Sequence, residues 1–430
     1  MSSVIYAILY NVLFIPVFYL ALFLVSLFNE KVRKGFWGRF GLFRKLKPFL
    51  KVKDADKPIL VLHCASMGEF EHTKPFLVEF KKRKPEYRII VLFFSPSGFE
   101  NVKSFEEVGL FLYSPHEIFF SIWRFMRKVK PSLWIVAKHD VWPNQIWFCH
   151  LFTVPLFLIN ASLHQQSSRL LLLTRAFHRS VYKYFTHILT VSETDRHNFS
   201  QLIGAEKCSV VGDTKYDQVI FRREESVKKE VIPAGIYKNR WTIVAGSTWP
   251  EDHQHLLPAF LKLLRDYENL LLIICPHEPT AAHIYELKSY LKKEPVILLS
   301  QLADYRNQRV VIIDRIGVLA NIYSIAKVAY VGGSFRQNIH NVLEAAVYKI
   351  PVIFGPVNQN SHEAQLLKAG KGGWEVHNSV EIENQVRKFL INEIHRQESG
   401  WQAFRVVEKN SGATQRTVDR ILFQLNFKKD

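Results

Sequence analysis

Cysteine is scarce in this chain, and what there is stands alone. The four cysteines, Cys64, Cys149, Cys208 and Cys275, show no paired spacing, which argues against a disulfide framework and against a zinc site. A reducing, cytoplasmic location fits this usage best, with each cysteine acting as a small buried apolar side chain. Low-complexity tracts and short-period repeats are also missing.

Acidic residues are in deficit. Lys and Arg number 57 against 39 Asp and Glu, a formal net charge of +18. Such an excess favours an anionic partner, which could be a nucleic acid, a phosphorylated substrate or an acidic membrane surface, and charge alone does not choose among them. With 430 residues, 48% of them hydrophobic, the chain is long enough for two domains.

Charge is absent altogether from Val4 to Phe28. This stretch is long enough to cross a hydrocarbon core of roughly 30 Å, and it predicts a membrane anchor helix over residues 1–30. A signal peptide fits less well, because no basic residue precedes the stretch and no small-residue cleavage site follows it. The basic linker 31–56 would then hold the body of the protein in the cytoplasm. A helix lying in the membrane interface remains the alternative, and it changes the depth but not the compartment.

Short apolar runs alternate with amphipathic stretches through the rest of the chain, as in a parallel sheet covered by helices on both faces. The runs are 58–63, 87–94, 132–137, 154–160 and 187–191, then 241–246, 270–276, 295–300, 310–315, 328–333 and 350–355. We therefore predict an α/β fold with two Rossmann-like doubly wound domains, 57–225 and 226–430, divided in the charged interval 222–239. The last helix is expected to pack back on the N-terminal domain. Ligands of such sheets bind outside the carboxyl ends of the strands, so we expect the site in the cleft between the domains.

The segment 331–356 carries the clearest candidate site. Its strand ends in Gly332 and Gly333, which let the backbone approach a ligand closely, and 341–348 has helical character. Backbone amides at such a turn and helix start can hold a phosphate. Glu344 is better suited to accept hydrogen bonds from ribose hydroxyls, while a tight structural turn is the alternative for the glycines.

A series of motifs extends along almost the whole chain. They are CASMGE (64–69), FFSPSGFE (93–100), DVWPN (140–144), GDTKYD (212–217), AGSTWPED (245–252), CPHEP (275–279) and the GGS, HNVLEAA and PVIFGP elements of 331–356. In order and spacing, together with the anchor and basic linker, they resemble the 3-deoxy-D-manno-oct-2-ulosonic acid (Kdo) transferases of glycosyltransferase family 30. These are membrane-anchored GT-B enzymes of Gram-negative lipopolysaccharide synthesis.

The resemblance implies transfer of Kdo from CMP-Kdo to a lipid A precursor, with inversion at the anomeric carbon. Glu69 matches the glutamate of the family's Ser-x-Gly-Glu motif and would be the general base, with Ser66, Gly68, Lys138 and Asp140 on the acceptor side. Without the resemblance, Glu69 would be interpreted as an ordinary carboxylate in the first turn of a helix.

The resemblance also implies donor-side residues in the second half. Ser247, Thr248 and Ser334 would bind phosphate or Kdo oxygens, and Pro276 and His277 would flank the cytosine. Glu344 would hold the ribose, and Asn341 would contact the phosphate. Gly317 would also be donor-binding, and Lys215 would pair with the Kdo carboxylate or the phosphate. Plain turn or cap chemistry is the alternative for the loop residues. No cofactor or metal is expected, and Asp54-Ala55-Asp56 is interpreted as a solvated turn of the linker.

Four positions depart from the family pattern. Lys138 stands where relatives often have Glu, His277 where they have Arg, Val318 where they have Glu and Ser162 where they have Arg. We expect CMP-Kdo, a phosphorylated lipid A precursor and the cytoplasmic face of the inner membrane as partners, and no nucleic acid. The alternatives are a membrane-associated GT-B transferase using a UDP-sugar and a non-catalytic, membrane-tethered binder of anionic lipid.

Overall fold

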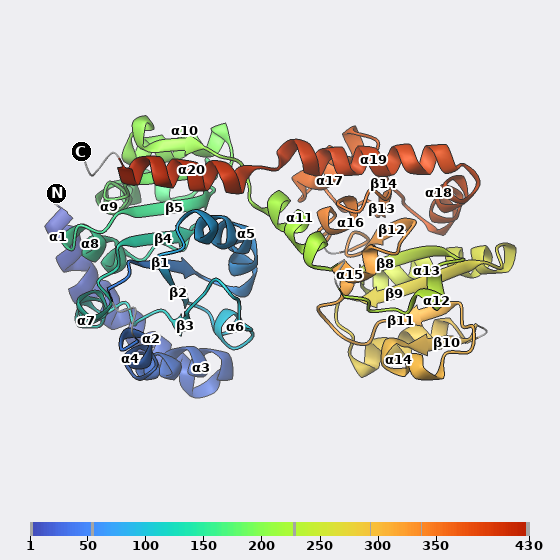
Figure 1. Cartoon of the computed structure of the whole chain (residues 1–430), viewed down its shortest axis with the longest axis horizontal. Helices are drawn as coiled ribbons and strands as arrows, with labels where there is room; N and C mark the ends of the chain where they lie inside the picture. Colours follow the sequence, from blue (N-terminus) through green and yellow to red (C-terminus); the bar gives the residue numbers. More distant parts are fainter. Residues whose placement is uncertain (1–2, 53–55, 227–228, 293, 337, 427–430) are drawn as a thin grey trace. The chain divides into compact units, whose positions relative to one another are not determined.

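The computed structural model describes residues 3–52, 56–226, 229–292, 294–336 and 338–426, so Asp54 and Ala55 of the expected linker turn lie outside the described residues. Contacts divide the chain into two compact units (Figure 1). Unit 1 is Met1–Gln218 with Ser411–Asp430, and unit 2 is Val219–Asn410. The division falls inside helix α11 (Lys215–Ser226), just before the interval 222–239 that the sequence indicated.

Unit 1 contains a seven-stranded parallel sheet in the order β3-β2-β1-β4-β5-β6-β7. Its strands are β1 (Ile59–Cys64), β2 (Arg88–Phe93), β3 (Leu110–Tyr113), β4 (Leu133–Ala137), β5 (Leu156–Ala161), β6 (His187–Thr190) and β7 (Cys208–Val210). Along β1, Val61 packs into one hydrophobic core and Leu60 and Leu62 into another. Because successive side chains of a strand point to opposite faces, both faces of the sheet are covered, which explains the continuous apolar runs.

Unit 2 repeats this plan with seven parallel strands in the order β10-β11-β9-β8-β12-β13-β14. Its strands are β8 (Trp241–Thr248), β9 (Leu270–Pro276), β10 (Val296–Leu298), β11 (Val310–Ile312), β12 (Val328–Val331), β13 (Val352–Phe354) and β14 (Gly373–Glu375). In both sheets the chain starts at an inner strand, winds to one edge and returns to build the other side. The winding direction changes between β1 and β4 in unit 1 and between β8 and β12 in unit 2.

The predicted doubly wound α/β class is confirmed, and each apolar run expected to be a strand overlaps one. The strands β3, β7 and β14 were missed. They have only three or four residues, and residues such as Ser209 and Glu375 interrupt their apolar character. Strands this short at or near a sheet edge are fixed by pairing with a neighbour, which a local sequence pattern does not record.

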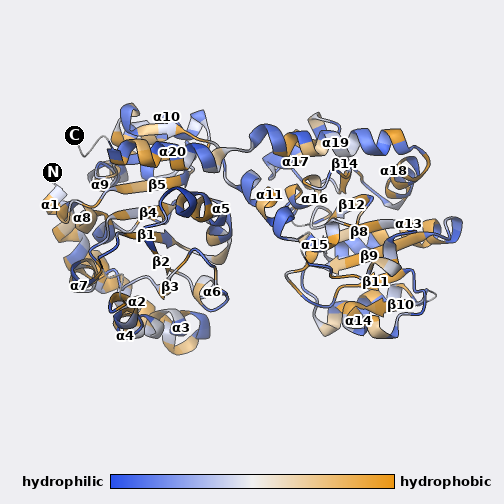
Figure 2. Ribbon diagram, viewed as in Figure 1, coloured by the Kyte–Doolittle hydropathy of each residue, from blue (hydrophilic) through white to orange (hydrophobic). Residues whose placement is uncertain are grey.

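Helices lie against both sheets, and the hydropathy colouring shows strands that are largely apolar beneath helices with polar outer surfaces (Figure 2). In unit 1 they are α5 (Met67–Arg83), α6 (Pro96–Phe99), α7 (Phe119–Val129), α8 (Pro143–Leu151), α9 (Leu172–Tyr182) and α10 (Glu193–Ile203). In unit 2 they are α12 (Ala234–Tyr237), α13 (Pro250–Asp266), α14 (Ala281–Tyr290), α15 (Leu319–Tyr323), α16 (Leu343–Ala346), α17 (His362–Ala369), α18 (Ser379–Ile391) and α19 (Glu393–Asn410). Short 3-10 helices are η2 (Arg39–Gly41), η3 (Ser168–Leu170), η4 (Ala205–Lys207) and η5 (Leu299–Asp304).

The uncharged N-terminal stretch forms one long helix from α1 (Ser3–Leu9) through a π-helical turn, η1 (Tyr10–Phe14), into α2 (Ile15–Phe28). Its 26 residues are long and apolar enough to cross a membrane. One side of it nevertheless packs against the rest of unit 1, where Asn11 and Asn144 exchange two hydrogen bonds of 2.9 Å. The expected linker contains two helices, α3 (Glu30–Gly38) and α4 (Leu42–Leu50).

The last helix, α20 (Ala413–Asn426), packs against α5 of unit 1, and its Val418 and Ile421 join the core on that side of the sheet. Its start is held by a carboxylate from far away in the sequence. Asp217 accepts hydrogen bonds from the backbone N–H groups of Gly412 at 2.6 Å and Thr414 at 2.7 Å. Since the first N–H groups of a helix have no partner within it, Asp217 supplies the missing acceptors.

We predict that Asp217→Ala lowers the free energy of unfolding by about 2 kcal/mol, because two charge-assisted hydrogen bonds are lost. Asp419→Ala on α20 is the matched control. It removes an exposed ion pair with Arg83, which is expected to change stability by less than about 1 kcal/mol. Urea unfolding of the full chain measures both, and equal effects of the two variants would contradict the role of Asp217.

Candidate active site

The winding change in unit 1 brings together polar side chains at the carboxyl ends of β1 and β4. Glu69 lies in the first turn of α5, directly after β1, and Lys138 and Asp140 follow β4. Ser66 caps α5, its hydroxyl oxygen accepting the N–H of Glu69 at 3.5 Å. A Cβ added at Gly68 would meet only the Ser66 hydroxyl, at 4.0 Å, so the surface beside Glu69 is open at this position.

The Glu69 carboxyl group is buried and fixed. Glu69 is only 7% exposed, and its Oε2 accepts the backbone N–H of Ala65 at 2.6 Å. Burial raises the pKa of Glu69 above its ordinary value, and the hydrogen bond from Ala65 offsets part of that rise. A carboxyl group with a raised pKa accepts a proton more readily than an exposed one.

Asp140 has the opposite electrostatic setting. Burial acts to raise the pKa of Asp140, but the hydrogen bond and charge of His63, together with Trp142 and His139, outweigh it and hold that pKa below its ordinary value. The His63 Nε2 lies 2.8 Å from Asp140 Oδ2, and His63 is fully buried in β1. Two carboxyl groups of one site therefore have pKa values shifted apart, the pattern typical of paired acid and base groups. His63 was missed from the sequence, where its only signal is a polar residue within an apolar run.

Unusual backbone angles occur after β4 and near the end of β5, next to this site. Lys138 has φ of +61° and Asn160, in β5, has φ of +52°, in the left-handed region that side chains rarely adopt. Asn160 is held there by hydrogen bonds with Thr214, whose hydroxyl donates to the carbonyl of His72 at 2.9 Å. Strained backbone of this kind concentrates at functional sites. The nearby Lys215 pairs with Asp213 at 3.1 Å.

The winding change in unit 2 brings the loop after β8 against the glycine turn after β12. A Cβ on Gly332 would lie 2.5 Å from the Ser247 carbonyl oxygen and 2.7 Å from the Thr248 Cα, so only glycine fits. Gly333 has φ of +90°, and Ser247 has φ of +53°. The two loops therefore pack directly against each other. Of their predicted donor residues only Ser247 is partly exposed, and Thr248 is buried and hydrogen-bonded to His253 at 2.9 Å.

Asp252, which the sequence interpretation did not single out, holds this turn in place. Its carboxylate accepts the backbone N–H groups of Trp249 and Gly333, each at 2.8 Å, and the hydroxyl of Tyr330 at 2.7 Å. Its position three residues after Trp249, at the start of α13, is that of a helix-capping carboxylate. The Gly333 N–H is thus already bonded to Asp252 and stabilises the turn.

Three aromatic rings stack beside the turn. His277, which follows β9, stacks on Trp249 at 4.9 Å and on His340 at 4.2 Å, and the Trp249 Nε1 donates to the His340 Nε2 at 2.8 Å. Burial, with a contribution from His277, lowers the pKa of His340 to about 4, which keeps it neutral and able to accept this hydrogen bond. Trp249 and His340 were not predicted to take part. The preceding Pro276 is buried at the end of β9.

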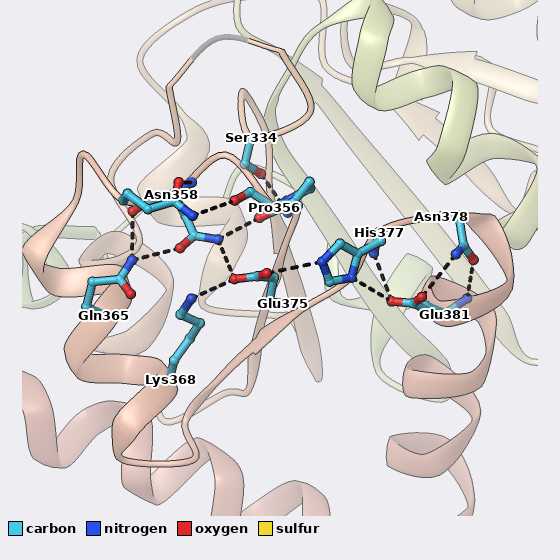
Figure 3. Close-up of polar contacts among 11 residues, drawn as sticks. Ser334, Pro356, Asn358, Gln365, Lys368, Glu375, His377, Asn378 and Glu381 are labelled. Carbon is cyan, nitrogen blue, oxygen red and sulfur yellow. Dashed lines mark hydrogen bonds and ion pairs between the residues drawn. The ribbon is translucent and has the colours of Figure 1, made fainter.

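Ser334 differs from its expected role. It is fully buried, and its hydroxyl oxygen accepts the backbone N–H of Gly355 at 2.6 Å. Figure 3 shows the network beyond it, in which Asn358 donates to the Gly355 carbonyl at 2.9 Å and to Glu375 at 2.8 Å, and Lys368 pairs with Glu375 at 2.6 Å. Donor binding by Ser334 stays a prediction, which its burial does not favour.

The remaining donor-side residues lie in short turns of unit 2. Glu344 lies in the four-residue α16, shorter than the predicted helix 341–348, and pairs with Arg222 at 2.7 Å. The Asn341 side chain accepts the N–H of Leu343 at 3.1 Å. Gly317 has φ of +84° and open space around its Cα. Their contacts to a donor stay predictions.

The described part of the chain contains no group of three or more His, Cys, Asp or Glu side chains that could hold a metal ion. All four cysteines are buried and free. The acceptor-side residues thus gather in unit 1 and the donor-side residues other than Lys215 in unit 2. Their meeting across a cleft stays a prediction.

Solved structures with the same architecture define the class. A UDP-GlcNAc 2-epimerase from Neisseria meningitidis matches with a TM-score of 0.57 at 15% identity, covering 85% of this chain and 99% of its own. A glycosyltransferase from Rickettsia africae matches with a TM-score of 0.53 at 13% identity, covering 86% and 99%. The two parallel sheets and these likenesses identify a GT-B fold.

Sequence comparisons show which known proteins the chain is similar to. Residues 34–218 match the family model for 3-deoxy-D-manno-octulosonic-acid transferase (kdotransferase). The chain is 29% identical to the 3-deoxy-D-manno-octulosonic acid transferase of Haemophilus influenzae over 84% of this chain and 86% of the relative. It is 29% identical to the Aquifex aeolicus enzyme of that name over 82% and 91%, and 25% identical to that of Rickettsia bellii over 93% and 94%. Over most of its length the chain is therefore similar to the Kdo transferases, a family of glycosyltransferases.

The raised pKa of Glu69 has a consequence for stability. A carboxyl group whose pKa rises on folding destabilises the folded state once the pH exceeds the ordinary carboxyl pKa of about 4.3. We predict that Glu69→Gln gains stability relative to the parent as the pH rises from 4.5 to 7.5, measured by urea unfolding.

Glu381→Gln serves as the control of opposite sign. Hydrogen bonds from His377 lower the pKa of Glu381, so its charged form stabilises the fold above the ordinary carboxyl pKa. This variant should lose stability relative to the parent mainly as the pH rises from about 2.5 to 4.5, because the lowered pKa places its titration below the ordinary carboxyl pKa. A Glu69→Gln variant that behaves like Glu381→Gln would disprove the raised pKa.

Proposed function

We propose that this protein transfers Kdo from CMP-Kdo to a phosphorylated lipid A precursor of the lipid IVA type in lipopolysaccharide core biosynthesis, with inversion. The supporting observation is the buried Glu69 carboxyl at the end of β1, fixed by Ala65 and with its pKa raised by burial. The similarity to Kdo transferases supports Kdo as the sugar and CMP-Kdo as its donor.

In this reaction the Glu69 carboxylate takes the proton of an acceptor sugar hydroxyl. The hydroxyl oxygen forms a bond to the anomeric carbon of Kdo while the bond from that carbon to the CMP phosphate oxygen breaks, so the configuration inverts. General base catalysis of this kind accelerates a reaction by about 10²- to 10⁴-fold. Lys138, close enough to lower the pKa of Glu69 by its charge, supplies a cation for an acceptor phosphate.

CMP-Kdo binds to unit 2 in this proposal. The ring stack of His277, Trp249 and His340 offers a face for the cytosine, and the Ser247 loop beside the Gly332 turn lies next to the phosphate. Glu344 holds the ribose, with Arg222 orienting its carboxylate. CMP leaves as a monophosphate, whose charge hydrogen bonds and cations can stabilise, so we propose catalysis without a metal or cofactor.

We predict that Glu69→Gln lowers kcat by at least about 100-fold, because the amide cannot accept the proton. The assay follows CMP release from CMP-Kdo with a lipid A precursor as acceptor, and CMP binding is measured alongside. The variant should bind CMP as the parent does.

The matched control is Glu71→Gln, in the same helix, whose carboxylate pairs with Lys74 at 2.5 Å. It should keep activity within about twofold. Full activity of Glu69→Gln would reject the assigned base. A parent that uses UDP-sugars, or releases no CMP, would reject the proposed reaction.

The same proposal places the protein at the cytoplasmic face of the inner membrane, bound through the helix Ser3–Phe28. Contacts with the rest of unit 1 extend along this helix, from the Tyr6 ring against Phe177 at 5.8 Å to the Tyr19 hydroxyl, which accepts the N–H of Glu117 at 2.6 Å. These contacts support a helix that lies in the membrane interface, in place of the single-pass anchor that the sequence predicted. A helix that crossed the membrane would lose its contacts with the rest of unit 1.

A single cysteine at an exposed position near the N-terminus tests this orientation. Val4, 65% exposed, is suitable because the four native cysteines are buried. In intact cells Val4→Cys should resist a membrane-impermeant maleimide and react only after lysis. Labelling of intact cells would show that the N-terminus crosses the membrane.

A further inference from the structure

A cavity of about 170 Å³ lies in unit 1, between the N-terminal helix and the carboxyl end of the sheet. Its walls include Tyr19 and Leu22 of α2, Phe36 and Arg39 from the segment after it, and Phe94 and His116 from the loops after β2 and β3. Most of these are apolar or aromatic. For comparison, a cavity of about 150 Å³ lined by apolar side chains holds a benzene molecule.

His116 makes the cavity chemically unusual. It is only 8% exposed, and neither ring nitrogen has a hydrogen-bond partner among the described residues. The rings of Phe40 at 4.9 Å, Tyr19 at 5.3 Å and Phe36 at 5.5 Å pack around it. A buried imidazole without partners costs free energy, so a ligand that supplies them would be favoured. Burial lowers the pKa of His116 to about 4, which leaves one nitrogen as donor and one as acceptor.

Arg39 adds a positive charge to the same wall. Its guanidinium donates to the carbonyl oxygens of Gly35 and Phe94 and lies 4.8 Å from the Phe94 ring centroid, and the ion pairs found among the described residues include none with Arg39. Lys31 lines the cavity as well and is exposed. The cavity thus combines an apolar interior with cations that match an anionic group.

The cavity adjoins the loop that carries the candidate base. The backbone N–H groups of Phe94 and Ser95 donate to the carbonyls of Cys64 at 3.1 Å and Ala65 at 2.8 Å, and the Ala65 N–H in turn holds Glu69 at 2.6 Å. The opposite wall belongs to the N-terminal helix, whose outer side exposes Leu20 by 60% and Leu24 by 50%. A molecule partly embedded in a membrane would therefore meet both the helix and the Glu69 loop.

We propose that this cavity binds an acyl chain of the acceptor glycolipid, with a phosphate of the same molecule on Arg39 and Lys31 and a polar group of the chain linkage on His116. The proposal rests on the function proposed above and names how that acceptor is recognised. A hydrocarbon segment of about six carbons fills the cavity, and its attachment point lies towards the Glu69 loop.

A binding experiment tests the cavity without any turnover. The probe is dihexanoyl phosphatidic acid below its micelle concentration, compared with dihexanoyl phosphatidylcholine and with inorganic phosphate, on the full chain. Leu22→Trp fills the cavity and should weaken phosphatidic acid binding at least tenfold. Leu20→Trp, the same change on the exposed side of the helix, is the matched control and should leave binding unchanged.

His116→Phe gives a second variant that should fold well, because the phenyl ring keeps the aromatic packing and removes the unpaired nitrogens. It should weaken phosphatidic acid binding severalfold without lowering the thermal unfolding temperature. Phosphatidylcholine and inorganic phosphate should each bind the parent at least tenfold more weakly than phosphatidic acid. Equal phosphatidic acid binding by the parent and Leu22→Trp would overturn the proposal.

Kinetics separate this inference from the proposed function. Leu22→Trp should raise the KM for the acylated acceptor at least tenfold, leave the KM for CMP-Kdo unchanged, and turn over a deacylated acceptor as the parent does. An unchanged KM for the acylated acceptor would reject the cavity while leaving the transferase assignment intact. Loss of phosphatidic acid binding in Leu22→Trp, with no turnover by the parent, would reject the transferase and retain the cavity as a lipid site.

Discussion

The hydrogen bond from the Ala65 N–H to the Glu69 carboxylate is the contact on which the unit 1 site depends. It fixes a buried carboxyl group at the end of β1, where the winding of the sheet changes direction and β4 delivers Lys138 and Asp140. The same short loop pairs with the loop after β2 through backbone hydrogen bonds. A shift of this loop would therefore disturb the candidate base and the lipid cavity together.

The loops at the corresponding sheet edge of unit 2 are held in place by different contacts. The sheet of unit 2 also changes direction between neighbouring strands, β8 and β12, but the space between the two loops is so narrow that Gly332 cannot carry a side chain. Asp252 satisfies the backbone N–H groups of the two loops with one carboxylate. Parallel sheets thus create a ligand edge in each unit by topology, and local side chains give each edge its chemistry.

Much of this could be predicted from local patterns. Apolar runs predicted strands buried on both faces, and the motifs predicted Glu69 and the glycine turn. The partners of these residues could not be predicted in the same way. His63 and Asp140 are 77 positions apart, and Asp252 and Gly333 are 81 apart. Such pairs form only when the strand order of a sheet is settled, because the order decides which strand ends are neighbours.

The sequence by itself determined the doubly wound class, the long apolar helix at the N-terminus and the resemblance to the Kdo transferases, since each follows from periodicity or from contiguous motifs. Tertiary structure alone decided that Glu69 is buried, that Ser334 is inaccessible, and that His116 and Arg39 face one cavity against the N-terminal helix. The physical reason is that burial and pairing are properties of what packs around a side chain, and those neighbours come from distant parts of the chain.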